Sequence, residues 1–235
     1  MRILLTGSSG WLGSALAPLL RGLGHEVIGI DPVPSAETRI VGSIADRDLI
    51  MRAVGENRIE AIIHGGALHK PNIESHANSD FIAANVQGTL NLLDAAVAAN
   101  VQRFVFTSTT SLMISQAIRD GFKGGARKAA WLTEAMSPEP RNIYGVTKLS
   151  AEHLCRLYHL RHRLPVVVLR TARFFPEPDG ACDRAVGRQH QGERTAVSAA
   201  DGGRCGAGAC RGIGEGTGAR LRHLHRLCAN AVPAR

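Results

Sequence analysis

The sequence lacks any hydrophobic run long enough to span a membrane. Its first residues also lack the basic start, the long apolar core and the small-residue cleavage site of a secretory signal. These two absences predict a cytoplasmic protein with no membrane partner, in which the cysteines stay reduced. At 235 residues, the chain has room for one ordinary domain, alone or with a small appendage.

From Gly180 onward the sequence contains no lysine, phenylalanine, tyrosine or tryptophan. Glycine, alanine and arginine dominate there, and no apolar period lasts long enough for a strand or a long helix. The net charge of +8 invites a nucleic-acid interpretation, but nine arginines against four acids in this segment supply most of that excess. We therefore predict that residues 179–235 form an irregular tail, separate from a domain made by residues 1–178.

Three interpretations of the tail compete. A metal site is not expected, because the candidate ligands match no compact pair in their spacing; they are Cys205, Cys210, His223, His225 and Cys228. A nucleic-acid partner is not expected either, since only the charge of the tail favours it. The favoured hypothesis is a frameshift near residue 180. If GC-rich codons are chosen for residues 222–226, reading one base later gives the strand-like run Gly-Thr-Tyr-Ile-Val.

The start of the chain carries the first motif. Ile3 to Leu5 is an apolar run typical of a short buried strand, and a helical apolar pattern runs from Leu12 to Leu23. Three glycines lie at the junction: Gly7, Gly10 and Gly13. A glycine backbone can come close to a diphosphate, and a helix N-terminus offers free N–H groups and the positive end of a dipole. We interpret the motif as a dinucleotide site; the alternative is a tight turn without a ligand.

An acidic residue follows the second predicted strand at the expected distance. Glu26 to Ile30 is strand-like and leads into Asp31, about twenty residues after the glycines. A carboxylate at this position can accept both ribose hydroxyls of NAD and repels the 2′-phosphate of NADP. Asp31 therefore predicts NAD, although the same residue could be an ordinary turn residue before Pro32.

Short apolar runs and helical patterns alternate along the rest of the first 178 residues. Strands are expected at 39–41, 60–64, 102–107 and 165–170, and helices after Asp46, over 81–100 and over 144–161. Residues 116–140, with several Gly, Lys and Arg, are predicted to be loop. This alternation is typical of an α/β fold, a doubly wound parallel sheet of the Rossmann-like kind.

The second motif is Tyr144 and Lys148, four residues apart on one helical face. An ammonium beside a phenol lowers its pKa, so such a tyrosine can move a substrate proton near neutral pH. A strand-end hydroxyl from the cluster Thr107 to Ser111 can bond the same substrate oxygen. The pair alone is common on helix surfaces, but the glycine motif and the hydroxyl cluster favour a catalytic role.

With these motifs together, residues 1 to about 178 resemble the extended short-chain dehydrogenases, the NAD-dependent epimerase/dehydratase family. The resemblance is carried by residues 6–13, Asp31, residues 64–67, 85–89 and 106–109, and residues 144–148. It implies NAD in the cleft and hydride exchange at a carbon that bears a hydroxyl. The implied substrate is a nucleotide-activated sugar or a related polyol or carbonyl compound.

The resemblance also implies roles for particular residues. Tyr144 would be the acid/base, and Lys148 would hold the nicotinamide ribose and tune the tyrosine. Thr109 would supply the catalytic hydroxyl, with Ser108 as a close competitor. The implied cofactor-binding residues are Gly7, Gly10, Trp11, Leu12, Gly13, Asp31, Ser43, Ile44, Gly66, Ala67, Leu68, Asn85, Thr107, Tyr144 and Lys148.

Some positions depart from the family pattern. Ser43-Ile44 stands where the family often has Asp-Ile or Asp-Leu, so the carboxylate that contacts adenine is missing. Met113-Ile114 stands where the family has Tyr-Gly after the hydroxyl cluster. The smaller substrate domain that the family builds after residue 178 is not visible. The reaction therefore stays open between epimerisation, dehydration and reduction, and a non-catalytic NAD-binding protein or inactive fragment is the alternative. A homodimer through two helices on a shared face is the family's habit and stays open too.

Three further residues are predicted to be structural. His64 and His69 flank the segment implied to face the cofactor, and hydrogen-bonded structural histidines are expected there. Cys155 is expected to be a small buried residue of its helix.

Overall fold

The computed structural model describes residues 1–123 and 132–172, and these residues form one parallel sheet with helices on both faces. The strands are β1 (Arg2–Thr6), β2 (Glu26–Asp31), β3 (Ile40–Val41), β4 (Ala61–His64), β5 (Arg103–Thr109) and β6 (Val166–Thr171). They pair in the order β3-β2-β1-β4-β5-β6, and every pairing is parallel. The predicted doubly wound α/β fold is confirmed.

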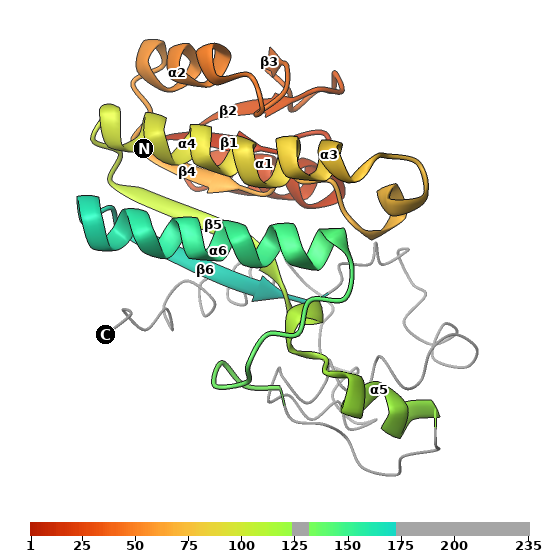
Figure 1. The fold of residues 1–235 in the computed structure, drawn as a ribbon. Helices are drawn as coiled ribbons and strands as arrows, with labels where there is room; N and C mark the ends of the chain where they lie inside the picture. Colours follow the sequence, from red (N-terminus) through yellow and green to blue (C-terminus); the bar gives the residue numbers. More distant parts are fainter. Residues whose placement is uncertain (124–131, 173–235) are drawn as a thin grey trace, which may run out of the picture.

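Four long helices cover the sheet. Helices α2 (Arg47–Glu56), α4 (Gly88–Ala98) and α6 (Ile143–His162) lie side by side on one face, while α1 (Trp11–Gly22) lies on the other (Figure 1). The larger core lies under the three helices and includes the fully buried Leu4, Ile62 and Phe104. Burying a side chain of this size contributes roughly 1.5–3 kcal/mol. This core fixes the sheet, and with it the positions of the strand ends.

Two predicted segments differ from the structure. The helix expected over 81–100 is interrupted: α3 (Asn78–Phe81) leads into a π-helix, η2 (Ile82–Gln87), before α4 begins. The segment predicted as loop from residue 116 begins with the helix α5 (Gln116–Lys123). Two 3₁₀ helices were not predicted: η1 (Lys70–Glu74) comes after β4, and η3 (Thr110–Met113) directly follows β5. None of the described helices is both long and apolar enough to cross a membrane.

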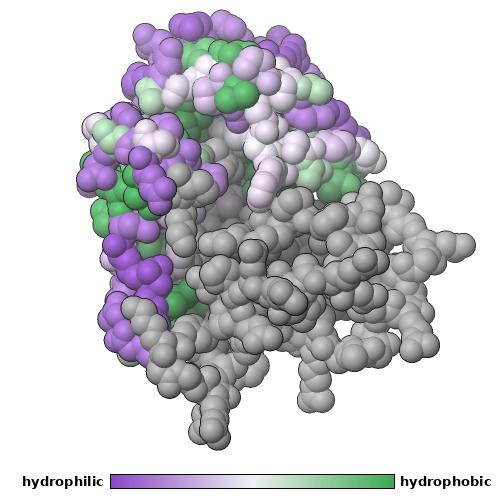
Figure 2. Space-filling model, turned by 90° about the vertical axis from the view of Figure 1, so that its right-hand side faces the viewer, coloured by the Kyte–Doolittle hydropathy of each residue, from purple (hydrophilic) through white to green (hydrophobic). Residues whose placement is uncertain are grey.

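Because every pairing is parallel, the carboxyl ends of the strands lie at one edge of the sheet, on the right in Figure 1. The chain builds β2 and β3 on one side of β1 and then crosses to β4, β5 and β6 on the other. The strand order therefore reverses between β1 and β4, and open α/β sheets bind their ligands at such a reversal. In Figure 2 the described residues around this end form a largely hydrophilic rim.

Candidate active site

The glycine turn, residues 7–13, stands at the reversal point and depends on its glycines. Gly7 has φ +76°, and a Cβ there would lie 2.7 Å from the Cα of Gly66 at the end of β4. A Cβ on Gly13 would lie 2.1 Å from the carbonyl oxygen of Gly7. The N-cap of α1, Gly10, has no side chain to cap the helix, and the first turn holds no acid. The positive end of α1 is thus left to attract an anion, as the sequence predicted.

Asp31 lies beside this turn. Its buried carboxylate accepts the backbone N–H of Ser9 at 3.2 Å and that of Val33 at 2.9 Å. Each carboxylate oxygen retains a lone pair for a further donor. The structure therefore brings Asp31 and the glycine turn together and leaves the carboxylate able to accept hydroxyl groups.

A hydroxyl cluster next to Asp31 was not predicted from the sequence. The Thr38 hydroxyl lies 2.7 Å from those of Ser8 and Ser9 and 3.0 Å from that of Ser35. These contacts tie the segment after β2 to the glycine turn. Small hydroxyl residues are common in turns, so the sequence offered no signal that these four would meet.

The segment at Ser43 and Ile44 is held by a residue that the sequence analysis missed. Asn91, fully buried in α4, donates from Nδ2 to the carbonyl oxygens of Ile44 and Ala45, both at 3.0 Å. Ile44 packs against Gly88, where a Cβ would come within 2.6 Å of its side chain. Ser43 is exposed and its hydroxyl accepts the N–H of Ala45. The signal available for Asn91 in the sequence was an amide side chain between Leu90 and Leu92 of the predicted helix.

The segment Gly66 to Leu68 follows β4 and is clamped by Asn85 of the π-helix. The Asn85 side chain accepts the N–H of Leu68 at 2.8 Å and donates to its carbonyl oxygen at 2.9 Å. It also donates to the hydroxyl of Thr147 in α6 at 3.0 Å. A π-helix whose asparagine side chain clamps a neighbouring segment agrees with the frequent occurrence of π-helical turns at functional sites.

Tyr144 and Thr109 are brought together, with one difference from the prediction. Thr109 ends β5, and its hydroxyl lies beside the half-buried phenol of Tyr144 in α6, close enough for a hydrogen bond to favour the phenolate. Burial raises the pKa of Tyr144 more than this hydrogen bond lowers it, so the pKa lies above its ordinary value. The predicted lowering by Lys148 is wrong for this structure, because desolvation dominates and the ammonium is engaged elsewhere.

Lys148 is almost fully buried one helical turn after Tyr144. Its Nζ donates to the carbonyl oxygen of Thr107 at 2.7 Å and lies 4.7 Å from the centre of the Phe106 ring. Burial lowers the pKa of Lys148 to about 8, against the opposing charge of Glu152. Only one of its three N–H donors has a described hydrogen-bond acceptor, so the ammonium can serve a further one.

Ser108 points away from Tyr144. Its hydroxyl donates to the carboxylate of Glu152 at 2.5 Å, and Arg170 of β6 binds the same carboxylate with two N–H groups at 2.9 and 2.7 Å. Successive strand residues face opposite sides, and here Thr109 reaches the phenol while Ser108 joins an ion pair. The geometry favours Thr109 over Ser108 as the hydroxyl beside Tyr144.

The structure also describes several of the remaining residues that the sequence singled out. Trp11, the first residue of α1, has 68% of its surface exposed, and Leu12 lies close to Gly65. His64 is buried and bonded at both ring nitrogens, which confirms its structural interpretation, and Cys155 is fully buried as expected. His69 is exposed, but partial desolvation of its ring, and then the charge of Lys148, lower its pKa. The predictions for residues 179–235 lie outside the described residues. Among the residues that the structure describes, no cluster of metal ligands occurs.

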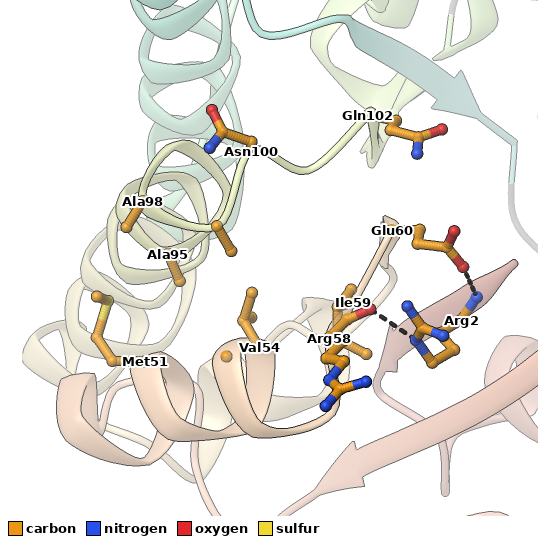
Figure 3. Close-up of a pocket in the computed structure, with 12 residues that line it drawn as sticks. Arg2, Met51, Val54, Arg58, Ile59, Glu60, Ala95, Ala98, Asn100 and Gln102 are labelled. Carbon is orange, nitrogen blue, oxygen red and sulfur yellow. Dashed lines mark hydrogen bonds between the residues drawn. The ribbon is translucent and has the colours of Figure 1, made fainter.

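A hollow of about 530 Å³ lies at the other end of the sheet, between α2, α4 and the amino ends of β1 and β4 (Figure 3). Its polar groups bond one another: Glu60 accepts the backbone N–H of Arg2 at 2.7 Å, and the Arg2 side chain donates to the Arg58 carbonyl at 2.8 Å. The first of these bonds lowers the pKa of Glu60. None of the predicted site residues lines this hollow, so it is not the candidate site.

A parallel sheet with a glycine turn at its reversal point and a Tyr-Lys pair at the same edge is the arrangement typical of dinucleotide-binding proteins of the Rossmann-like class. The chain belongs to the NAD dependent epimerase/dehydratase family, whose model matches residues 3–203. The match continues past residue 178, into the predicted tail. The recognition of this family from sequence is confirmed, as is NAD as its cofactor.

Individual relatives are similar over the same region. The chain is 30% identical to the "uncharacterized UDP-glucose epimerase YtcB" of Bacillus subtilis (strain 168), over 86% of this chain and 66% of that protein. The solved UDP-glucose 4-epimerase of Thermus thermophilus with NAD is 26% identical, with TM-score 0.61 over 72% of this chain and 54% of that one. The Bordetella bronchiseptica enzyme WbmG, solved with NAD and UDP, is 28% identical, with TM-score 0.58 over 72% and 52%. The chain thus spans about half to two thirds of these proteins.

The residues present fit NAD on structural grounds. Gly7 and Gly13, where a Cβ would collide, allow the turn to lie close to the sheet. The uncapped start of α1 can receive a diphosphate. Asp31 offers acceptors for ribose hydroxyls beside that turn.

Proposed function

We propose that the chain is an NAD-dependent oxidoreductase of the epimerase/dehydratase type that acts on a nucleotide-activated sugar, with Tyr144 as acid/base. The observation that carries this proposal is the placement of the Thr109 hydroxyl beside the Tyr144 phenol, with Lys148 buried one helical turn further on, at the edge of the sheet that also holds the glycine turn. The relatives named as UDP-glucose epimerases, and the neighbour solved with UDP, support a UDP-sugar as the substrate class.

The residues divide the work by their contacts. The glycine turn, Asp31 and the segment 66–68 would hold NAD, which when bound supplies the hydride acceptor. Tyr144 would exchange a proton with the substrate hydroxyl, and Thr109 would bond the same oxygen. The Thr109 hydroxyl donates to Ser111 at 3.0 Å in this structure, so it would have to turn from Ser111 to donate to an oxygen beside Tyr144. Because burial raises the pKa of Tyr144, the phenol starts protonated at neutral pH in this structure.

An assay with UDP-glucose and UDP-galactose tests this function. The full chain is incubated with each sugar nucleotide and NAD, and the products are separated by chromatography. Interconversion of the two, or oxidation with formation of NADH, supports the proposal. A chain that binds NADH but changes neither sugar nucleotide, nor a wider panel of them, contradicts it.

The second candidate is a protein that binds NAD without turnover. One observation supports this alternative: the chain spans 66% of its B. subtilis relative and 54% of the T. thermophilus enzyme. NADH binding without turnover in the assay above is its expected signature.

The division of the chain also remains a proposal. Residues 1–178 would form the NAD-binding domain, and residues 179–235 would be an out-of-frame tail in place of the substrate domain. Sequencing the gene across codons 170–190 tests this: a shifted frame supports it, and an intact frame contradicts it. A homodimer and a cytoplasmic location are proposed for the same protein, and light scattering and cell fractionation would test them.

A further inference from the structure

His64 ends β4 and is only 1% exposed, with a hydrogen-bond partner at each ring nitrogen. Its Nδ1 lies 2.7 Å from the hydroxyl of Thr6 in β1, and its Nε2 lies 3.0 Å from the hydroxyl of Thr89 in α4. The rings of Phe104 and Phe106 pack against the imidazole. A fully enclosed imidazole with two hydroxyl partners can act as a fixed connector between strands and helix.

The direction of each bond follows from the outer partners. Thr89 donates its hydroxyl proton to the carbonyl oxygen of Asn85 at 2.6 Å, so its oxygen must accept the Nε2–H of His64. Nδ1 then carries no proton and accepts the hydroxyl of Thr6. The Thr6 oxygen in turn accepts the backbone N–H of Gly66 at 3.0 Å. The relay is complete only with a neutral imidazole protonated at Nε2.

The relay reaches both ends of the segment 66–68 and the start of the catalytic helix. One end is Gly66, whose backbone packs against Gly7. The other end passes through Asn85, which clamps the backbone of Leu68 and donates to Thr147. Thr147 donates to the carbonyl oxygen of Tyr144 at 3.0 Å. His64 therefore lies at the centre of a hydrogen-bond network that runs from Thr6 and Gly66, beside the glycine turn, to the backbone of Tyr144.

We propose that His64, as its neutral Nε2–H tautomer, is a positioning residue that couples the cofactor-lining segment 66–68 to the start of helix α6. The inference rests on the proposed function, because it takes that segment to be where NAD binds. His64 touches neither cofactor nor substrate in this account. It acts by holding Gly66 and Leu68 in one arrangement relative to Tyr144.

The groups that face His64 keep it neutral. Strand β1 presents Thr6, α4 presents Thr89, and β5 presents two phenylalanine rings, while the charge that acts on it is Lys148 of α6. Burial, then the Lys148 charge, lowers the pKa of His64 well below its ordinary value. Because the folded-state pKa is depressed, the stability that the neutral relay contributes is complete above about pH 6.5, the ordinary pKa, and declines as the pH falls below it. In the folded protein the imidazole stays neutral until the pH reaches the lower folded-state pKa.

The experiment measures NADH affinity by fluorescence titration of the full chain, in which saturable binding by the wild type tests the proposed function first. His64→Leu and Thr89→Val should then bind NADH about ten-fold more weakly, because they leave buried polar partners unpaired. His64→Gln should keep most of the affinity, because its amide can accept from Thr6 and donate to Thr89. His153→Gln, an exposed position of α6, is the control and should bind as the wild type does.

Two further readouts separate positioning from a purely structural role. The wild-type affinity should hold through pH 6.5, because the folded-state pKa of His64 lies well below that value, and should fall only on further acidification, whereas His64→Gln should lose that dependence. Amide hydrogen exchange at Gly66 and Leu68 should accelerate in Thr89→Val, with the paired β1–β2 amides unchanged, and this needs no cofactor. Wild-type affinity in both His64→Leu and Thr89→Val, or unchanged exchange at the two amides, would overturn the proposal.

Discussion

The glycine-turn side of the candidate site is shaped by backbone, and the proposed catalytic side by buried polar side chains. On the glycine-turn side, Gly7 and Gly13 allow contacts that any Cβ would block, and the start of α1 carries no capping side chain. On the catalytic side, Tyr144 and Lys148 both have pKa values displaced by burial. The glycine turn should therefore contribute to cofactor affinity through groups that do not titrate, while the catalytic side should govern the chemistry and respond to pH.

The largest effect is expected from Tyr144→Phe, which removes one oxygen from the catalytic side. Turnover of the sugar nucleotide should fall about 10²- to 10⁴-fold, the range typical of a lost general acid/base. NADH affinity should stay unchanged, because the glycine turn is untouched. Steady-state assays beside NADH titration check both halves of the comparison, and full activity in this variant would refute the role of the phenol.

The choice between Thr109 and Ser108 gives the next effect. Thr109→Ala should lower turnover about 10²-fold, as for the loss of one donor that stabilises a transition state. Ser108→Ala should leave turnover nearly unchanged and lower the melting temperature, because Ser108 bonds the Glu152–Arg170 ion pair. The reverse pattern in paired kinetic and thermal measurements would assign the catalytic hydroxyl to Ser108.

Lys148 should make the stability of the catalytic side depend on pH. Its pKa of about 8 lies below the ordinary 10.5, so between these values the folded protein binds fewer protons than the unfolded chain. The free energy of unfolding should therefore rise with pH across this window, by about 2–3 kcal/mol relative to Lys148→Met. Urea unfolding of both proteins at several pH values measures the difference, and parallel curves would contradict the buried ammonium.

The smallest effect concerns two glycines of one helix. Gly13→Ala should destabilise the protein by about 1–3 kcal/mol and weaken NADH binding, because its Cβ meets the Gly7 carbonyl at 2.1 Å. Gly22→Ala is the matched control, since a Cβ there meets nothing within 4 Å. It should be neutral or stabilising by up to about 1 kcal/mol. Equal unfolding curves for the two variants would show that the turn does not need its glycine.

The sequence allowed the local parts of both sides to be predicted. A strand, a glycine triplet and an amphipathic helix follow one another directly, and Tyr144 and Lys148 lie one helical turn apart. Asn91, Thr147 and the hydroxyl cluster around Thr38 could not be predicted in the same way. Their partners come from distant parts of the chain, and only the assembled sheet brings them within bonding distance.

Two errors have physical causes of the same kind. The lowered pKa expected for Tyr144 assumed an exposed pair, whereas burial raises the pKa of the phenol and Lys148 donates to Thr107. The single helix expected from residue 81 contains a π-turn at Ile82–Gln87. One extra residue in a turn barely changes the apolar period, so periodicity alone does not reveal it.

The central claim is that the opening turn of this chain holds a dinucleotide. The most direct measurement is a fluorescence titration of the full chain with NADH at neutral pH, with wild type and Gly13→Ala side by side. The account predicts saturable binding by the wild type and weaker binding by the variant. A folded wild-type protein that shows no saturable NADH binding would contradict it.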